Sequence, residues 1–305
     1  MRLFIISFLF SGVLFGKVEV INQNNTKIFL KGPSCQRLRV TENALREWNF
    51  DSKKFGEPNK CKCTKVSCSL DITPVVPKHI LYLEGKHPNF AGPNCFNTAL
   101  NDQRILKERR ASSVDEINFW RNSPLCKQIK KGEEISPGDL YIVFDDSGLP
   151  LHGFTYISDD IVFSKGGPGR EIKYKLDEFD WMFRTYKVPK ECYHVNEVGK
   201  CPRYGLAYSC ESLQSYRLKN PMKNKRIQEV LNELDAIAMT VEQLLLSEDS
   251  STFLDSQSLN KKLQKMRVPI IEEKGNPKYN SIEKFYWKII WFKFIGLDRQ
   301  IRDMI

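Results

Sequence analysis

The stretch Gly92-Pro93-Asn94-Cys95-Phe96-Asn97-Thr98-Ala99-Leu100 decides how this chain is interpreted. Gly92-Pro93 supplies a turn, and proline near the first position of a helix costs no backbone hydrogen bond. We therefore expect a helix from Asn94 to about Arg110, with Cys95 in its first turn. The unpaired N–H groups and the positive dipole end of a helix N-terminus favour a thiolate, the nucleophilic form of cysteine. A free cysteine can also simply pack in a core, so Cys95 needs a second group beside it to be a candidate nucleophile.

That second group lies in the segment richest in strand-forming residues. Turn residues flank the apolar run Leu140-Tyr141-Ile142-Val143-Phe144, which is followed by the strand Leu151-His152-Gly153-Phe154-Thr155-Tyr156-Ile157 and then by Ile161-Val162-Phe163-Ser164. Short apolar runs separated by such turns predict an antiparallel meander. A histidine on the central strand, within reach of the thiol, could take its proton and later return it to a leaving amine. His152 is therefore the candidate base, and the pair predicts a thiol hydrolase.

Ser164 is the candidate for a third position. A hairpin loop made of residues 158–160 would place Phe154 opposite Ser164. Because side chains alternate between the two faces of a strand, Ser164 then shares a face with His152 and is its diagonal neighbour. We expect its hydroxyl to orient the imidazole.

The first residues and the cysteines both suggest export. Met1-Arg2 followed by the apolar run from Leu3 to Gly16 is typical of a secretory signal peptide and is shorter than the roughly 20 residues that span a bilayer, although an uncleaved anchor is the alternative. We expect a secreted or periplasmic protein without a transmembrane span. The chain has nine cysteines, an odd number, so one thiol must remain unpaired.

If that thiol is Cys95, the other eight can form up to four disulfides, as expected for an exported protein. These are Cys35, Cys61, Cys63, Cys68, Cys126, Cys192, Cys201 and Cys210. As an alternative, Cys61, Cys63 and Cys68 could bind zinc together with His79, but their spacing is not a standard ligand pattern. We predict neither a metal nor a cofactor.

The charge indicates the kind of partner. The formal net charge is +10, which suits a protein that works near an anionic polymer, such as a bacterial cell envelope or nucleic acid. Basic clusters such as residues 107–110 and 223–226 contain no aromatic side chains for base stacking, so nucleic acid is not expected. The oligomeric state is left open.

The pattern along the chain indicates an α+β protein of several parts. After residues 1–16 we expect a cysteine-rich, β-leaning segment over 17–70 with strands at 18–21 and 27–30, a catalytic domain over 71–190, a cysteine-rich connector over 191–221 and a helical region over 222–305. Within the catalytic domain, Ser113 and Glu116 have the spacing of a capping box and predict a second helix that ends before Pro124.

The helical C-terminal region shows two apolar segments. Apolar residues recur at intervals of three and four from Ile227 to Leu245, which predicts one long helix packed on the core. The polar run Ser247 to Ser258 is expected to be a linker. The aromatic-rich stretch Ile282 to Ile301 predicts an amphipathic packing helix, with contact to a membrane surface as the alternative. The region lacks His and Cys, so we expect it to supply no catalytic residue.

Between about Ile80 and Phe183 the sequence resembles the NlpC-type cell-wall cysteine peptidases. The resemblance rests on Asn94-Cys95-Phe96-Asn97, Pro137-Gly138-Asp139-Leu140 and the strand that carries His152, in the family's order and spacing. It implies a papain-like core with an antiparallel sheet and an N-terminal catalytic helix. Ser164 stands where the family usually has His, Asn or Gln. A tyrosine upstream of the nucleophile assists in some members, and Tyr82 is the nearest match.

The resemblance also implies a reaction. Family members hydrolyse an amide in the stem peptide of peptidoglycan through a thioester acyl-enzyme, typically between D-glutamate and a diamino acid. A related amidase or acyltransferase acting on another γ-glutamyl-like bond is one alternative. The other is a catalytically inactive, disulfide-braced module that binds the cell envelope on the same fold.

Overall fold

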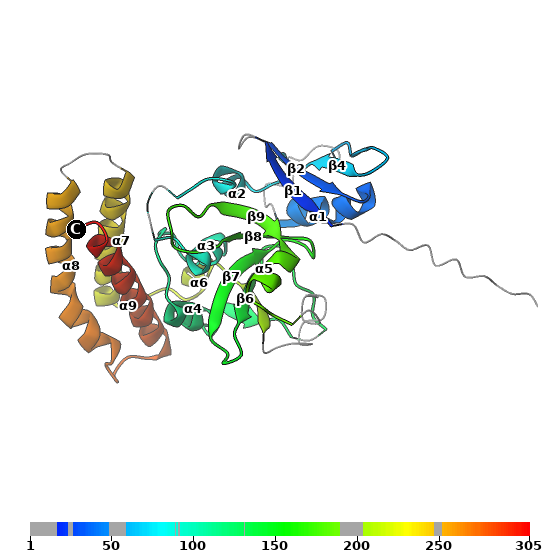
Figure 1. Ribbon diagram of the computed structural model, residues 1–305. Coiled ribbons are helices and arrows are strands. Elements are labelled where there is room, and N and C mark those ends of the chain that lie inside the picture. The colour runs from blue at the N-terminus through cyan, green and yellow to red at the C-terminus, as the bar shows by residue number, and fades with distance from the viewer. Residues whose placement is uncertain are drawn as a thin grey trace, which may run out of the picture.

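The structure, a computed structural model, describes residues 17–23, 27–48, 59–88, 90, 92–130, 132–189, 204–246 and 252–305. The fold is α+β and contains two antiparallel sheets. Figure 1 shows the smaller, N-terminal sheet and helix α1 at one end of the larger sheet, and the helices α7, α8 and α9 at the opposite end. The predicted fold class is therefore confirmed at the level of mixed helices and antiparallel sheets.

The N-terminal sheet has the order β1-β2-β4-β3. Its elements are β1 (Glu19–Gln23), β2 (Lys27–Gly32), β3 (Lys62–Cys63) and β4 (Cys68–Asp71), and they are accompanied by α1 (Cys35–Trp48). The strands expected at 18–21 and 27–30 are confirmed as β1 and β2, shifted by one or two residues. Helix α1 buries Leu38 and Leu45 against Ile28 and Leu30 of β2, so the sheet has one apolar face.

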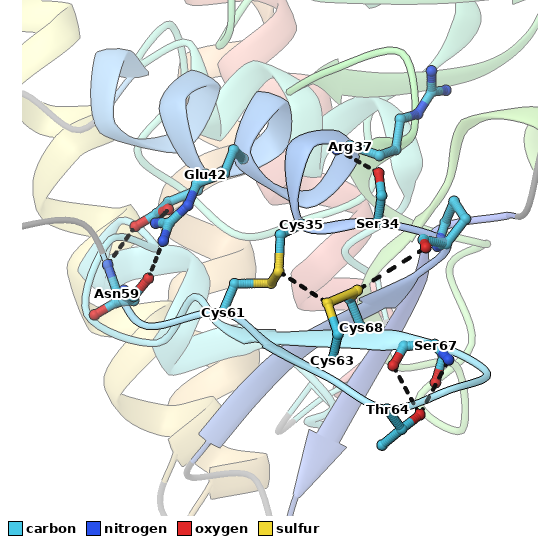
Figure 2. Close-up of a disulfide and its surroundings, with 12 residues drawn as sticks. Ser34, Cys35, Arg37, Glu42, Asn59, Cys61, Cys63, Thr64, Ser67 and Cys68 are labelled. Carbon is cyan, nitrogen blue, oxygen red and sulfur yellow. Dashed lines mark hydrogen bonds and ion pairs between the residues drawn. A yellow bond between two sulfur atoms is a disulfide. The ribbon is translucent and has the colours of Figure 1, made fainter.

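Two disulfides close this N-terminal unit. Cys35 at the start of α1 is bonded to Cys61, and Cys63 is bonded to Cys68. Figure 2 shows the two bridges side by side, with the Cys35 and Cys63 Sγ atoms 3.3 Å apart. A third disulfide joins Cys126 to Cys210, which are paired residues on neighbouring strands of the larger sheet. The expected bracing by disulfides is thus confirmed for these cysteines, whereas Cys192 and Cys201 lie outside the described residues.

The larger sheet has the order β5-β10-β6-β7-β8-β9 and is antiparallel throughout. Its strands are β5 (Cys126–Gln128), β6 (Leu140–Phe144), β7 (Pro150–Tyr156), β8 (Ile161–Lys165), β9 (Tyr174–Glu178) and β10 (Gly205–Cys210). Strands β6, β7 and β8 are the expected meander. Thr155 is paired with Phe163, which is the register that sets Phe154 opposite Ser164.

Helices cover both faces of this sheet. Helix α3 (Cys95–Asp102) packs against β7 and β8 on one face. On the other face, α5 (Phe179–Thr185) buries Phe179 and Phe183 against Tyr141 and Phe154. Alternation along β7 therefore sends neighbouring side chains into two different layers. The remaining helices of this part are α2 (Lys78–Leu83), α4 (Val114–Arg121) and α6 (Leu213–Lys219).

Two helix predictions need correction. The helix that we expected to reach Arg110 ends at Asp102. Arg104 adopts a left-handed backbone conformation (φ 55°), and this conformation cannot continue a right-handed α-helix. Ser113 does cap α4 by accepting from the Glu116 amide, but the reciprocal half of the capping box is missing among the described contacts. The Glu116 carboxylate instead forms a bidentate pair with buried Arg110, at 2.7 Å for each bond.

Three long helices form the C-terminal part: α7 (Lys225–Leu246), α8 (Thr252–Lys274) and α9 (Ser281–Arg302). Helix α7 carries the predicted stripe of apolar residues. Helix α9 is the predicted aromatic-rich helix, and it begins with a capping box of Asn280 and Glu283. The linker predicted at 247–258 is wrong over 252–258, which belong to α8. This polar segment contains no glycine or proline to interrupt a helix.

Helix α9 attaches these helices to the rest of the protein. Its Phe292 stacks on Phe119 of α4, with ring centroids 5.0 Å apart. Gly296 of α9 faces Arg110, and a Cβ atom there would lie 2.5 Å from the guanidinium, so only glycine permits this approach. The packing role expected for this region is therefore confirmed. None of the helices within the described ranges is long and apolar enough to cross a membrane.

Candidate functional site

Cys95 is the first residue of α3 and is held there by a capped helix start. The Asn94 side chain accepts a hydrogen bond from the Asn97 amide at 3.0 Å and donates to the Ser112 carbonyl at 2.8 Å. This is the usual way to satisfy an otherwise unpaired first-turn amide. Cys95 is only 6% exposed and is the one free cysteine in the described part of the chain. The expectation that Cys95 stays outside the disulfides is confirmed there.

The thiol is surrounded by backbone amides. It receives hydrogen bonds from the amides of Gly153, Phe96 and Cys95 itself. Burial raises the pKa of the Cys95 thiol, whereas these amides and the nearby Lys165 ammonium act in the opposite direction. Because burial is the larger effect, the resting group is a neutral thiol.

Glycine at position 153 makes this approach possible. A Cβ atom at Gly153 would lie 3.1 Å from the ring of Phe96, so a larger residue would push α3 away from β7. The described pairs between β7 and β8 begin at Thr155, two residues beyond Gly153. The thiol thus lies against the buried backbone of the strand that carries His152, at a residue for which no pair with β8 is described.

His152 is fully buried and has one hydrogen-bond partner among the described residues. Its Nδ1 lies 2.8 Å from the Tyr186 hydroxyl, and the two rings stack with centroids 4.8 Å apart. Nε2 is buried and has no partner in the described structure. Burial lowers the pKa of His152 to about 3, so the imidazole is neutral. In the tautomer that donates Nδ1–H to Tyr186, Nε2 is a free base.

The sulfur and the imidazole approach β7 from different faces. Gly153 and Thr155 face α3, since Thr155 donates to Asp102 at 2.7 Å. His152 and Phe154 face α5, where Phe154 packs edge-on against Phe179. Among the described contacts no hydrogen bond joins Cys95 Sγ to His152 Nε2, so the two groups that we expected within reach of one another are not bonded in this conformation.

Ser164 does not have the expected partner. It shares the face of His152, but its hydroxyl contacts Met182 Sδ at 4.0 Å, and Tyr186 takes the position beside the imidazole. The expected hydrogen bond from Ser164 to the imidazole is therefore wrong, and the hydroxyl that contacts His152 belongs to Tyr186. The cause is α5: its side chains fill the space above Ser164, and Tyr186, directly after α5, reaches His152.

Tyr82 lies on α2 and is exposed. Its ring contacts Lys86 Nζ at 4.1 Å and Arg109 Cζ at 5.9 Å from the ring centroid. No described contact joins it to Cys95. The structure thus places Tyr82 near Lys86 and Arg109, with no described contact to the thiol.

A cavity of about 270 Å³ lies along α3, toward its C-terminal end. Its lining is His79, Leu83, Asn97, Thr98, Asn101, Asp102, Arg104, Arg109 and Tyr174. The Asp102 carboxyl group lies 3.6 Å from His79 Nε2. Burial raises the pKa of Asp102 to about 7 and lowers the pKa of His79 to about 4, so at neutral pH this contact joins a neutral imidazole to a carboxyl group that is about half protonated.

The alternative zinc site is not assembled as the sequence suggested. Cys61, Cys63 and Cys68 are all consumed in disulfides, which removes the thiolates that zinc would need. His79 lies in the cavity beside Asp102.

Three residues on or beside the two ends of α3 were missed by sequence reasoning. Lys165 follows Ser164 directly, yet its buried ammonium, which donates to the Gly167 and Gly169 carbonyls, cannot be read from strand periodicity. Tyr186 directly follows the short helix α5, and this helix was not predicted. Asp102 could have been predicted from the sequence. Positions i, i+3 and i+7 share one side of a helix, which places Cys95, Thr98 and Asp102 on the same side of α3.

Comparisons of the chain with models of protein families, with curated proteins and with solved structures find no match.

Proposed function

We propose that this protein is a secreted or periplasmic cysteine hydrolase with a papain-like core, which cleaves an amide bond in peptidoglycan stem peptides. The observation that carries the proposal is the free Cys95 thiol at the capped start of α3, in contact with the Gly153 amide of the strand that bears His152. A thiol at a helix start, surrounded by amides and followed by a histidine, is the arrangement that nucleophilic catalysis by cysteine requires.

In the first step the Cys95 sulfur attacks the amide carbonyl carbon and its proton passes to His152 Nε2. The Tyr186 oxygen accepts Nδ1–H and so holds the tautomer in which Nε2 is basic. The C–N bond of the tetrahedral intermediate then breaks, and the imidazolium returns the proton to the leaving amine. Water, deprotonated by His152, hydrolyses the resulting thioester and restores the thiol.

The resting geometry requires one adjustment before this chemistry. Nε2 must turn toward the thiol, because the two groups start on different faces of β7. Catalytic hydrogen bonds are often long or absent without substrate and tighten in the complex. Lys165 supports the thiolate once it forms, since its ammonium lowers the pKa of Cys95.

The substrate class rests on the resemblance to NlpC-type peptidases and on charge. The net charge of +10 favours binding to an anionic envelope polymer. The related amidase or acyltransferase reaction would use the same thioester and differ only in the acceptor of the acyl group.

The second candidate is a module that binds the envelope without turnover. Two observations favour it: burial keeps both the Cys95 thiol and the His152 imidazole neutral, and Nε2 has no partner in the described structure. Both proposals share the fold and predict binding to peptidoglycan, so only turnover separates them.

The test is mass spectrometry of purified peptidoglycan fragments after incubation with the wild type, Cys95→Ala and a matched surface variant, Lys175→Met. We expect new stem-peptide fragments with the wild type and Lys175→Met and none with Cys95→Ala. If all three proteins leave the fragments unchanged while each sediments with insoluble peptidoglycan, the hydrolase is excluded and the binding module is favoured. Cleavage by Cys95→Ala would exclude Cys95 as the nucleophile.

A further inference from the structure

The cavity along α3 carries more positive than negative groups. Arg104 and Arg109 line it together with a single carboxyl group, Asp102. Each guanidinium is close enough to lower the pKa of His79. Such a field favours an anion over a cation, and a carboxylate is one of the anions that a guanidinium group binds through two parallel hydrogen bonds.

Two donors on its wall are uncommitted. The Arg109 guanidinium has no hydrogen bond or ion pair with any residue that the structure describes. It lies 5.9 Å from the centre of the Tyr82 ring and is close enough to Asp102 to lower the pKa of that carboxyl group. The Tyr174 hydroxyl likewise has no hydrogen-bond partner within the described ranges, although the residue is only 3% exposed. The amide groups on the wall are already used, since Asn97 and Asn101 both donate to the Glu108 carbonyl.

The cavity lies on the thiol's side of α3. Thr98 and Asp102 line it, and both share the face of Cys95 by helical periodicity. With a rise of about 1.5 Å per residue, Asp102 lies roughly 10 Å along the axis from Cys95. An extended peptide covers that length with about three residues. A substrate with its amide at the sulfur would thus have a group near Arg109.

We propose that this cavity binds a free carboxylate of the peptide whose amide is attacked by Cys95, with Arg109 and the Tyr174 hydroxyl as its donors. The proposal rests on the proposed function for the identity of the peptide, and the carboxylate site itself can be tested without turnover. Stem peptides of peptidoglycan carry such carboxylates, so the site would select acidic over amidated stems.

Binding of a carboxylate to the cavity along α3 should weaken as pH rises through neutrality. Asp102 is the group responsible, because its carboxyl, with a pKa of about 7, becomes an anion beside the bound carboxylate. The groups facing it are His79 from α2, Arg109 from the loop after α3, Thr155 from β7 and Tyr174 from β9. Since His79 has a pKa of about 4 and Tyr174 of about 12, neither titrates in this interval.

The experiment is isothermal titration calorimetry on the Cys95→Ala protein, which cannot turn over its ligand. The probes are glutarate, the tripeptide Ala-γ-Glu-Lys and the same tripeptide with its carboxylates amidated. We expect the acid to bind and amidation to weaken binding at least about tenfold, since a hydrogen bond to a charged group is worth that much. Arg109→Met should weaken binding of the acid by a similar factor, and Tyr174→Phe should weaken it by a smaller factor. Arg226→Met, which removes an exposed arginine of α7, is the matched control and should change nothing.

Equal binding of the acid and the amide, or unchanged affinity in Arg109→Met, would overturn the carboxylate site. Its failure is separable from failure of the proposed function. Glutarate that binds through Arg109 while no peptidoglycan fragment is ever cleaved would keep the site and remove the hydrolase. Cleavage of stem peptides by the wild type without measurable binding of either acid would keep the hydrolase and remove the site.

Discussion

The two ends of α3 are built for opposite tasks. At its N-terminal end, Cys95 and the neighbouring His152 are buried, and burial keeps the thiol and the imidazole neutral. At its C-terminal end, Asp102 lies in a polar cavity beside two arginines. One short helix thus separates a dry site, where protons can be exchanged, from a charged site, where an ionic ligand can be held.

The difference teaches how burial acts on each kind of group. At the thiol, burial works against the anion that chemistry requires, so amides and Lys165 must oppose it. At Asp102, burial removes a negative charge that would repel a carboxylate. The same physical effect opposes the proposed chemistry at Cys95 and favours the proposed binding of a carboxylate at the cavity.

The largest effect is expected from Asp102→Asn on stability. The pKa of Asp102 rises from 3.8 to about 7 on folding, so between these values the folded state binds more protons and the wild type loses stability as pH rises. Asparagine cannot titrate. The free energy of unfolding of the variant relative to wild type should increase from pH 4 to pH 7, by up to about 1.4 kcal/mol for each unit of the shift, and then level off.

Urea unfolding at several pH values measures this difference. Asp303→Asn, which removes an exposed carboxyl group directly after α9, is the matched control. A profile for Asp102→Asn that does not change with pH would mean that the Asp102 carboxyl has an ordinary pKa in the folded protein.

At the thiol end, His152→Ala should lower turnover of a stem peptide at least about a hundredfold, the usual contribution of a general base. His152→Gln tests the same role with less change in volume, because a buried ring is removed in the alanine variant. Circular dichroism establishes that each variant is folded. Activity of the glutamine variant within about threefold of wild type would show that His152 is not the base.

Much of this arrangement follows from local sequence signals. Gly92-Pro93 before Cys95, and the short apolar runs separated by turns around His152, were sufficient to predict a helix start at Cys95 and a central strand that carries His152. The odd cysteine count pointed to a free thiol, and Cys95 is free in the described structure. Each of these signals involves residues close in sequence, or a count.

The relation between the two faces of β7 could not be predicted. Alternation states that His152 and Gly153 point in opposite directions, but only the packing of α3 and α5 decides which face meets the thiol. Tyr186 reached its place through a helix too short to show periodicity. The left-handed Arg104, which ends α3 and begins the basic wall of the cavity, has no sequence signal of its own.

Tyr186→Phe sharpens the assignment of the orienting group. The variant keeps the ring stacked on His152 but removes the hydroxyl that lies 2.8 Å from Nδ1. We expect turnover to fall about tenfold, which corresponds to one hydrogen bond of about 1.4 kcal/mol. Ser164→Ala is the control on the same face and should stay within about twofold. The reverse order of the two effects would restore Ser164 as the orienting residue.

The smallest effect should come from Lys165→Met, and it isolates the electrostatics of the thiol from the rest of catalysis. The Lys165 ammonium lowers the pKa of Cys95, so its removal should raise that pKa and slow alkylation by iodoacetamide a few-fold at pH 7. Burial lowers the pKa of Lys165 itself to about 8, and above this value the wild-type side chain is neutral too. The difference between the two proteins should therefore shrink as pH rises past 8. Lys175→Met, on the next strand and exposed, should react like the wild type at every pH. If the ratio of rates stayed constant from pH 7 to pH 9.5, the methionine would be acting through access to the thiol and not through charge.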